Sequence, residues 1–93
     1  MTEAETPRKE AVAIRYDGKD DNAPRVVAKG AGFVADQILA AAAKHTVPVV
    51  QNRTLTAMLM AVELDREIPP ALYQAVAEVL AHVYRLDQQR RRR

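Results

Sequence analysis

The chain has 93 residues, of which 48% are hydrophobic and 28% charged, a composition typical of one globular domain and not of a disordered chain. It contains no cysteine, which excludes disulfides, thiolate nucleophiles and cysteine-ligated metals. The net charge is +2, but Arg90 to Arg93 are all basic, so the rest of the chain is slightly acidic. No uncharged apolar run approaches the roughly 20 residues that a membrane-spanning helix needs.

The first third of the chain predicts an arm followed by a hairpin. Residues 1–8 mix charges with Pro7 and show no periodicity, which indicates a flexible arm. Large and small residues alternate from Ala11 to Tyr16, the period of a strand. Turn-forming residues fill 17–23, so we expect an exposed loop there and a second, antiparallel strand over Arg25 to Lys29.

The middle of the chain predicts a helix between two strands. Gly30 and Gly32 lack the third glycine and the acidic partner of a nucleotide-binding loop, so we interpret them as turn residues. Apolar spacing predicts a helix from Phe33 to Lys44, and the valines of 47–50 predict a short strand. Strand, helix and strand would form a parallel, right-handed crossover unit.

Two further helices are expected in the last third of the chain. Asn52 or Thr54 can cap a helix that ends near Leu64. Residues 67–70 contain an acid and two prolines, a helix-start signal, and the apolar stripe that follows predicts a helix to about Gln88. The fold class is therefore α/β in a single domain, with a small mixed sheet of three or four strands flanked by three or four helices. Its bounds would be 9–88, before a basic disordered tail over 89–93.

The polar residues do not indicate a catalytic or metal site. His45 falls at the C-terminal end of a predicted helix, where the helix dipole favours a protonated imidazole. His82 follows Glu78 by four residues, which is the spacing of a surface pair on a helix. The acidic residues at 17, 20 and 21 lack the spacing of a calcium loop. Serine is absent as well as cysteine. We therefore expect no metal, no cofactor and no enzymatic activity.

Four segments of the sequence follow one another in an order typical of one family. They are Ala11 to Asp17 (AVAIRYD), Ala23 to Gly30 (APRVVAKG), Val47 to Val49 (VPV) and Glu67 to Ala81 (EIPPALYQAVAEVLA). Together they resemble the cytoplasmic C-terminal domain of the flagellar and type III secretion export-switch proteins, the FlhB family. The resemblance runs from about Pro7 to Leu86.

The resemblance also points to a degenerate reaction site. In the family, an Asn-Pro-Thr-His tetrapeptide just before the first strand cuts its own backbone through the asparagine side-chain nitrogen. The same place here reads Thr6, Pro7, Arg8 and Lys9. A threonine has no such nitrogen, and a hydroxyl without an adjacent base is a poor nucleophile. We expect the backbone to stay intact.

The resemblance further implies a shallow apolar docking pocket for export substrates. The matching positions here are Ala23, Pro24, Ala77 and Leu80. Pro24 would offer a rigid apolar ring without a donor, against which a short hydrophobic peptide can lie. Two other interpretations remain open, namely core packing for Leu80 and a turn role for Pro24.

Our leading hypothesis is a cytoplasmic, non-cleaving homologue of the export-switch domain. It would bind export substrates and protein components of the export apparatus, take no small-molecule substrate, and reach the membrane only through that apparatus. Full-length members of the family carry a transmembrane half before this domain, and the start at Met1 favours a stand-alone polypeptide.

The alternative is a small RNA-binding α/β module. The alanine-rich helix and the residues 44–49 after it are similar to ribosomal proteins that bind kinked RNA. The balanced charge of the body and 4% aromatic residues argue against nucleic acid as a partner. For Arg90 to Arg93, a solubilising tail and a contact with anionic lipid or nucleic acid both remain open.

Overall fold

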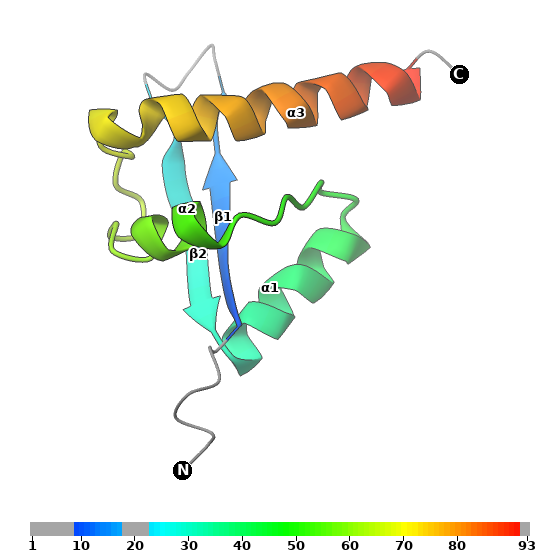
Figure 1. Cartoon of the computed structure of the whole chain (residues 1–93). Helices are drawn as coiled ribbons and strands as arrows, with labels where there is room; N and C mark the ends of the chain where they lie inside the picture. Colours follow the sequence, from blue (N-terminus) through cyan, green and yellow to red (C-terminus); the bar gives the residue numbers. More distant parts are fainter. Residues whose placement is uncertain (1–8, 18–22, 92–93) are drawn as a thin grey trace.

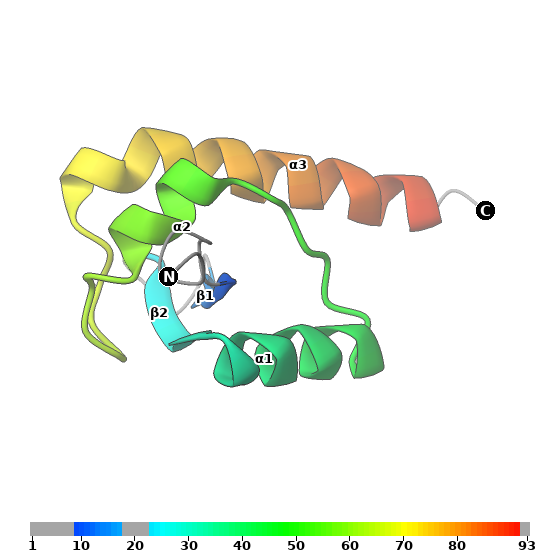
Figure 2. The same cartoon turned by 60° about the horizontal axis from the view of Figure 1, so that its bottom comes forward.

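The computed structural model describes residues 9–17 and 23–91, with side chains described as far as Arg85. In chain order the elements are β1 (Glu10–Arg15), β2 (Arg25–Ala31), α1 (Phe33–Lys44), α2 (Arg53–Leu59), the short 3-10 helix η2 (Pro70–Leu72) and α3 (Tyr73–Arg91) (Figure 1). Figure 2 shows the two strands between α1 on one side and α2 with α3 on the other. The mixed α/β class and the single domain were predicted from the sequence.

The two strands form the expected antiparallel hairpin. Glu10 pairs with Ala31 at one end and Arg15 with Arg25 at the other, with a register shift between Ala13 and Ile14. The loop that was expected to join them lies largely outside the described residues. Beyond Ala31, the Gly32 N–H donates to the Lys9 carbonyl over 2.7 Å, which brings the chain directly into α1.

The prediction of a sheet with three or four strands was wrong. Within the described residues the sheet has two strands, and residues 47–50 form no strand. The reason lies at the end of α1, where the Val47 N–H donates to the Ala42 carbonyl (2.8 Å) and the Thr46 N–H to the Ala43 carbonyl (3.3 Å). Because this helix end uses the Val47 donor and Pro48 has none, two successive residues have no N–H to donate to a strand ladder, which disfavours a strand here. The expected crossover unit is therefore also absent.

A second segment partly extends the sheet on the outer side of β2. The Asp65 N–H donates to the Val26 carbonyl (2.7 Å), and the Ile68 N–H donates to the Pro24 carbonyl (2.9 Å). The only strand-like pairing in this segment, among the residues described, is the isolated bridge between Arg25 and Glu67. These bonds hold the loop before α3 against the hairpin.

Helix α1 has the predicted bounds, and the two glycines before it have different roles. Gly32 has φ of 60°, a left-handed conformation that suits glycine, and it makes the turn into the helix. The turn interpretation was wrong for Gly30, which lies in β2. A side chain on Gly30 would collide with Val34, so the glycine allows α1 to start close to the strand.

The other two helices differ from the predictions mainly at their ends. Asn52 caps α2 as expected, since its side-chain oxygen accepts from the Leu55 N–H over 3.0 Å. The helix ends at Leu59 and not near Leu64. α3 begins after the 3-10 turn and runs through Arg91, which is beyond the predicted end.

The core lies between the hairpin and the helices α2 and α3. Its six buried residues come from β2, α2, the loop after it and α3: Val26, Leu55, Leu59, Val62, Ile68 and Val76. Val12 and Ile14 of β1 and Val79 and Leu80 of α3 pack partly against this cluster. The first part of the apolar stripe expected along α3, through Leu80, thus faces the core. No helix in the described part of the chain has the length and apolar character needed to cross a bilayer.

Candidate docking site

Two of the four predicted docking residues line a single apolar hollow along α3. Ala77 and Leu80 form part of a recess of about 600 Å³, which we call the α3 hollow. Its complete lining is Tyr16, Thr46, Pro48, Ala77, Leu80, Ala81, Val83 and Tyr84. Most of these side chains are apolar or aromatic, so the recess suits an apolar group of a partner.

Helical spacing and a tight turn build the two walls of the α3 hollow. Leu80, Ala81 and Tyr84 come three, four and seven residues after Ala77, which places the four along one face of α3. The opposite wall includes Pro48, which comes shortly after the turn that ends α1. Tyr84 remains 64% exposed and Tyr16 48%, so aromatic surface is available at this recess.

The other two predicted docking residues lie outside this hollow. Ala23 is buried with only 3% of its surface exposed, and Pro24 is half-buried. The Pro24 carbonyl accepts the Ile68 N–H, so its backbone helps to hold the loop before α3. Leu80 packs against the core, as one of the open interpretations has it, and it also lines the hollow. Its docking role stays a prediction.

Six residues of the lining were missed by the sequence-based prediction. Ala81 and Tyr84 could have been found, because they lie four and seven residues after Ala77 on the predicted helix. Thr46 and Pro48 could not have been found from the sequence, because the turn at the end of α1 brings them to the hollow.

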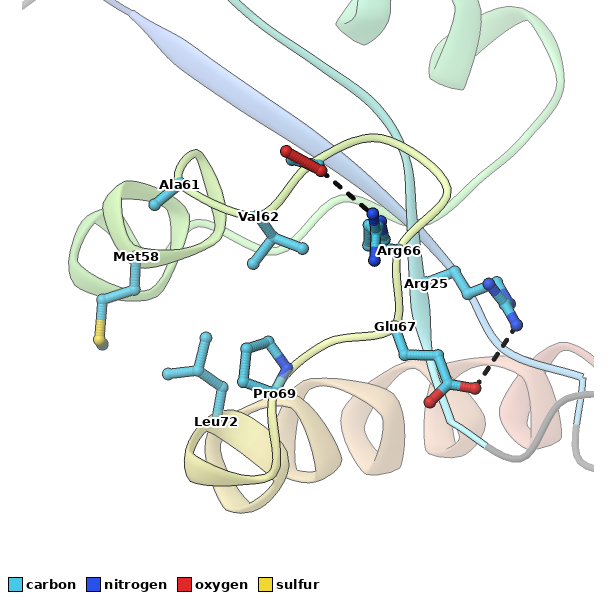
Figure 3. Close-up of a pocket in the computed structure, with 9 residues that line it drawn as sticks. Arg25, Met58, Ala61, Val62, Arg66, Glu67, Pro69 and Leu72 are labelled. Atoms are coloured by element: carbon cyan, nitrogen blue, oxygen red, sulfur yellow. Dashed lines mark hydrogen bonds and ion pairs between the residues drawn. The ribbon is translucent and has the colours of Figure 1, made fainter.

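A second recess opens near the other end of α3 and has a different character. This loop hollow has a volume of about 690 Å³ and is lined by Arg25, Met58, Ala61, Val62, Glu63, Arg66, Glu67, Pro69 and Leu72 (Figure 3). Its charged members form two ion pairs, Arg25 with Glu67 at 3.4 Å and Arg66 with Glu63 at 3.5 Å. Both pairs are substantially exposed and contribute little to stability.

Two cations of β2 hold the loop that borders this second recess. The Lys29 ammonium donates to the carbonyls of Met60 (2.8 Å) and Val62 (2.7 Å) just after α2. Arg25 donates to the Asp65 carbonyl over 2.7 Å. A positive charge at the C-terminal end of a helix is favourable, so Lys29 acts as a cap supplied by a distant strand.

The remaining polar residues form no recognisable reactive cluster within the described ranges. No group of three histidine, aspartate or glutamate side chains there could hold a metal ion. His45 is the residue that ends α1, as predicted, and the expected pairing of His82 with Glu78 stays a prediction. Thr6, Pro7 and Arg8 of the degenerate tetrapeptide lie outside the described residues, and Lys9 pairs with Asp36 over 2.9 Å.

The sequence is similar to proteins of the bacterial export apparatus. The model of the family described as FlhB HrpN YscU SpaS matches residues 5–83. The uncharacterized protein YlqH of Bacillus subtilis is 45% identical over 84 residues, which cover 90% of each chain. The flagellar biosynthetic protein FlhB of Salmonella typhimurium is 44% identical over 85 residues, 90% of this chain and 22% of that one. The chain thus spans about a fifth of the length of this FlhB.

The fold is similar to that of a solved export protein. The crystal structure of the cytoplasmic domain of FlhB from Shewanella putrefaciens superposes with a TM-score of 0.84 at 39% identity, covering 89% of this chain and 65% of that one. The resemblance seen in the sequence is therefore confirmed. These similarities give no support to the RNA-binding alternative.

Proposed function

Because the chain belongs to the FlhB HrpN YscU SpaS family, we propose that it takes part in flagellar or type III protein export as a docking domain. It binds apolar segments of export substrates or of apparatus proteins and performs no catalysis. The observation that carries this proposal is the α3 hollow, in which Ala77 and Leu80 lie side by side along one wall.

The chemistry of the α3 hollow supports a peptide as its ligand. Its volume lies within the range of about 300 to 1,000 Å³ that is usual for binding recesses. Its walls offer small and aromatic side chains and no charged group. A partner side chain that is apolar gains most from such a surface, because a charged one would lose its hydration without compensation.

The test is a fusion of this domain to the part of a full-length FlhB that precedes its own C-terminal domain. Export of flagellar substrates into the medium is measured in a strain without other FlhB. We expect partial export, because the fusion carries the proposed docking surface but not the Asn-Pro-Thr-His tetrapeptide. A fusion that is stable and inserted in the membrane but exports nothing would refute the proposal.

A matched pair of substitutions locates the docking surface. Ala77→Asp places a charge in the α3 hollow at an exposed position, and it should reduce export at least about tenfold because the carboxylate must be desolvated on binding. Ala57→Asp places the same charge on an exposed face of α2 that lines neither hollow, and it should leave export unchanged. Equal export by the two variants would exclude the α3 hollow.

The substitution Pro24→Asp tests whether the docking surface extends beyond the α3 hollow to Pro24. Pro24 is half-buried, and its carbonyl rather than its ring makes the bond to Ile68. If the docking surface includes this ring, as the family resemblance implies, the variant should fold and export less. Unchanged export would restrict the docking surface to the residues that line the hollow.

A further inference from the structure

Strand β1 has one edge that faces away from β2. The Gly32 N–H donates to the Lys9 carbonyl over 2.7 Å, so the backbone groups of Lys9 point toward the side of β2. Because the backbone groups of successive strand residues point in opposite directions, those of Glu10, Val12 and Ile14 point away from β2. We call the backbone of these three residues the β1 edge.

The alternation holds along the whole of β1 because the irregularity of the hairpin lies in β2. The partner of Ala13 is Ala28, whereas the partner of the next residue, Ile14, is Val26. Val27 is therefore the additional residue, and β1 itself stays regular. The β1 edge offers one donor and one acceptor from each of its three residues, along a six-residue strand roughly 20 Å long.

No backbone group of the β1 edge forms a hydrogen bond with another residue in the described ranges. The opposite edge of the sheet is occupied, since the loop before α3 bonds to β2. Residues 45–52 pass beside β1 between α1 and α2 (Figure 2), but Val47 and Val49 are 55% and 54% exposed, so this segment is not packed tightly there. Unpaired groups in this arrangement are complementary to another extended strand.

The β1 edge leads toward the α3 hollow. Tyr16 directly follows β1 and lines that hollow, and Figure 1 shows the end of β1 reaching α3. The side chains of Val12 and Ile14 pack partly against the core beneath α2 and α3. A strand added beside β1 would turn every second side chain to this same face of the sheet. A backbone surface and an apolar recess therefore adjoin one another.

We propose that the ligand of the docking domain binds as an extended strand along the β1 edge, with an apolar side chain at its end in the α3 hollow. This inference rests on the proposed function and specifies the conformation of the ligand. Backbone hydrogen bonds to β1 provide affinity for many sequences, and the hollow selects the apolar side chain. A helical ligand satisfies its own backbone groups and would leave the β1 edge unpaired.

The direct test is a binding titration of the full chain with a designed peptide. The probe is a capped peptide of eight residues in which three valines alternate with three threonines between terminal lysines. One version is N-methylated at the valines and a second at the threonines, so each version loses the N–H groups of one edge. Because the valines must face the core side, one version should bind at least about tenfold more weakly than the other. Equal affinity of the two versions would overturn the proposal.

Nuclear magnetic resonance separates this inference from docking as such. On binding of the unmethylated peptide, the signals of Ala77 and Leu80 should shift, and exchange of the Val12 amide hydrogen should slow at least about tenfold. Shifts at Ala77 and Leu80 without slower exchange at Val12 would refute the extended strand and leave docking intact. A lack of both effects would refute the inference and the proposed docking surface together.

A pair of proline variants tests the assigned direction of the β1 backbone without any ligand. Val12→Pro removes an N–H of the β1 edge and should lower Tm by less than about 5 °C, whereas Ala13→Pro removes one that faces β2 and should lower Tm by more than about 10 °C. Equal losses would show that the β1 edge is wrongly assigned.

The Val12→Pro variant then tests the binding itself. Circular dichroism checks that it retains its fold, and it should bind the unmethylated peptide at least about tenfold more weakly, because the ring replaces a donor at the β1 edge. A folded Val12→Pro variant that binds this peptide as well as the unmodified protein does would contradict the proposal.

Discussion

Thr46 holds a backbone conformation that β-branched residues rarely adopt. Its φ of 59° lies in the left-handed region, where the side chain of a threonine is crowded. The conformation is needed because Thr46 and Val47 close the end of α1 by donating to the carbonyls of Ala43 and Ala42. The same turn leads into Pro48 and so forms one wall of the α3 hollow.

Thr46→Gly should therefore stabilise the protein. Glycine removes the crowding at positive φ, and we expect the free energy of unfolding to rise by about 1 kcal/mol despite the greater entropy of the unfolded chain. Urea denaturation followed by circular dichroism measures the change. The control is Thr54→Gly within α2, which should lower stability by roughly 0.5 kcal/mol. A loss of stability in Thr46→Gly would contradict the inferred crowding.

Lys29→Met should destabilise the fold through the loop after α2. The substitution keeps much of the side-chain length but removes the ammonium that serves two carbonyls, so we expect a loss of about 2 kcal/mol in unfolding free energy. Lys44→Met changes an exposed lysine in the last turn of α1 and should cost less than about 0.5 kcal/mol. Equal effects in the two variants would show that the two hydrogen bonds of Lys29 do not stabilise the loop.

At the scale of elements, the features that depend on neighbouring residues in the sequence were predicted well. The features that depend on contacts between distant residues were not. The bounds of α1 and the cap at Asn52 depend on neighbours in sequence, and both were predicted. The carbonyls just after α2 bind Lys29, which lies more than twenty residues before that helix, and such a distant partner is not visible in the local sequence. The valines of 47–50 have the composition of a strand, but the helix end takes the donor of Val47. Composition therefore predicted a strand that the backbone hydrogen bonds at the end of α1 disfavour.

The candidate docking site likewise contains residues that are close in sequence and residues that are distant. Ala77 and Leu80 were predicted together and lie together, because a helix places residues three apart on one face. Ala23 and Pro24 are more than fifty residues away in sequence, and their relation to α3 depends on how the loop before it packs. The sequence pattern contains no information on that packing.

Leu80→Ala tests whether Leu80 serves mainly to stabilise the core or mainly to line the α3 hollow. Leu80 is half-buried, so its truncation should cost less than about 2 kcal/mol of unfolding free energy. Leu59→Ala provides the reference, since Leu59 is 2% exposed in the core and should cost about 2 to 5 kcal/mol. Thermal or urea melts of both variants give the comparison. An effect of Leu80→Ala as large as that of Leu59→Ala would remove Leu80 from the docking surface and assign it to the core.

At the scale of the whole molecule, this chain has the fold of its family, whereas Thr6 stands where the family resemblance implies an asparagine. The family model matches residues 5–83, and this span includes Thr6 to Lys9, which the family resemblance places at the cleavage tetrapeptide. If that placement holds, the family fold does not depend on the residues that would cut the backbone. Docking needs a surface, whereas cleavage needs one particular nucleophile, and these requirements are separable.

The purified protein should consequently remain a single intact chain. Thr6 lacks the amide nitrogen that would attack the backbone carbonyl before Pro7, and a hydroxyl without a base reacts too slowly to replace it. Intact-mass spectrometry after prolonged incubation at neutral pH should show only the full-length mass. The matched variant combines Thr6→Asn, Arg8→Thr and Lys9→His, which restores the Asn-Pro-Thr-His tetrapeptide around Pro7. If the fold still presents this segment as the family does, the variant should release a fragment that begins at Pro7. The same fragment from the unmodified protein would show that threonine suffices and that this chain can cut itself.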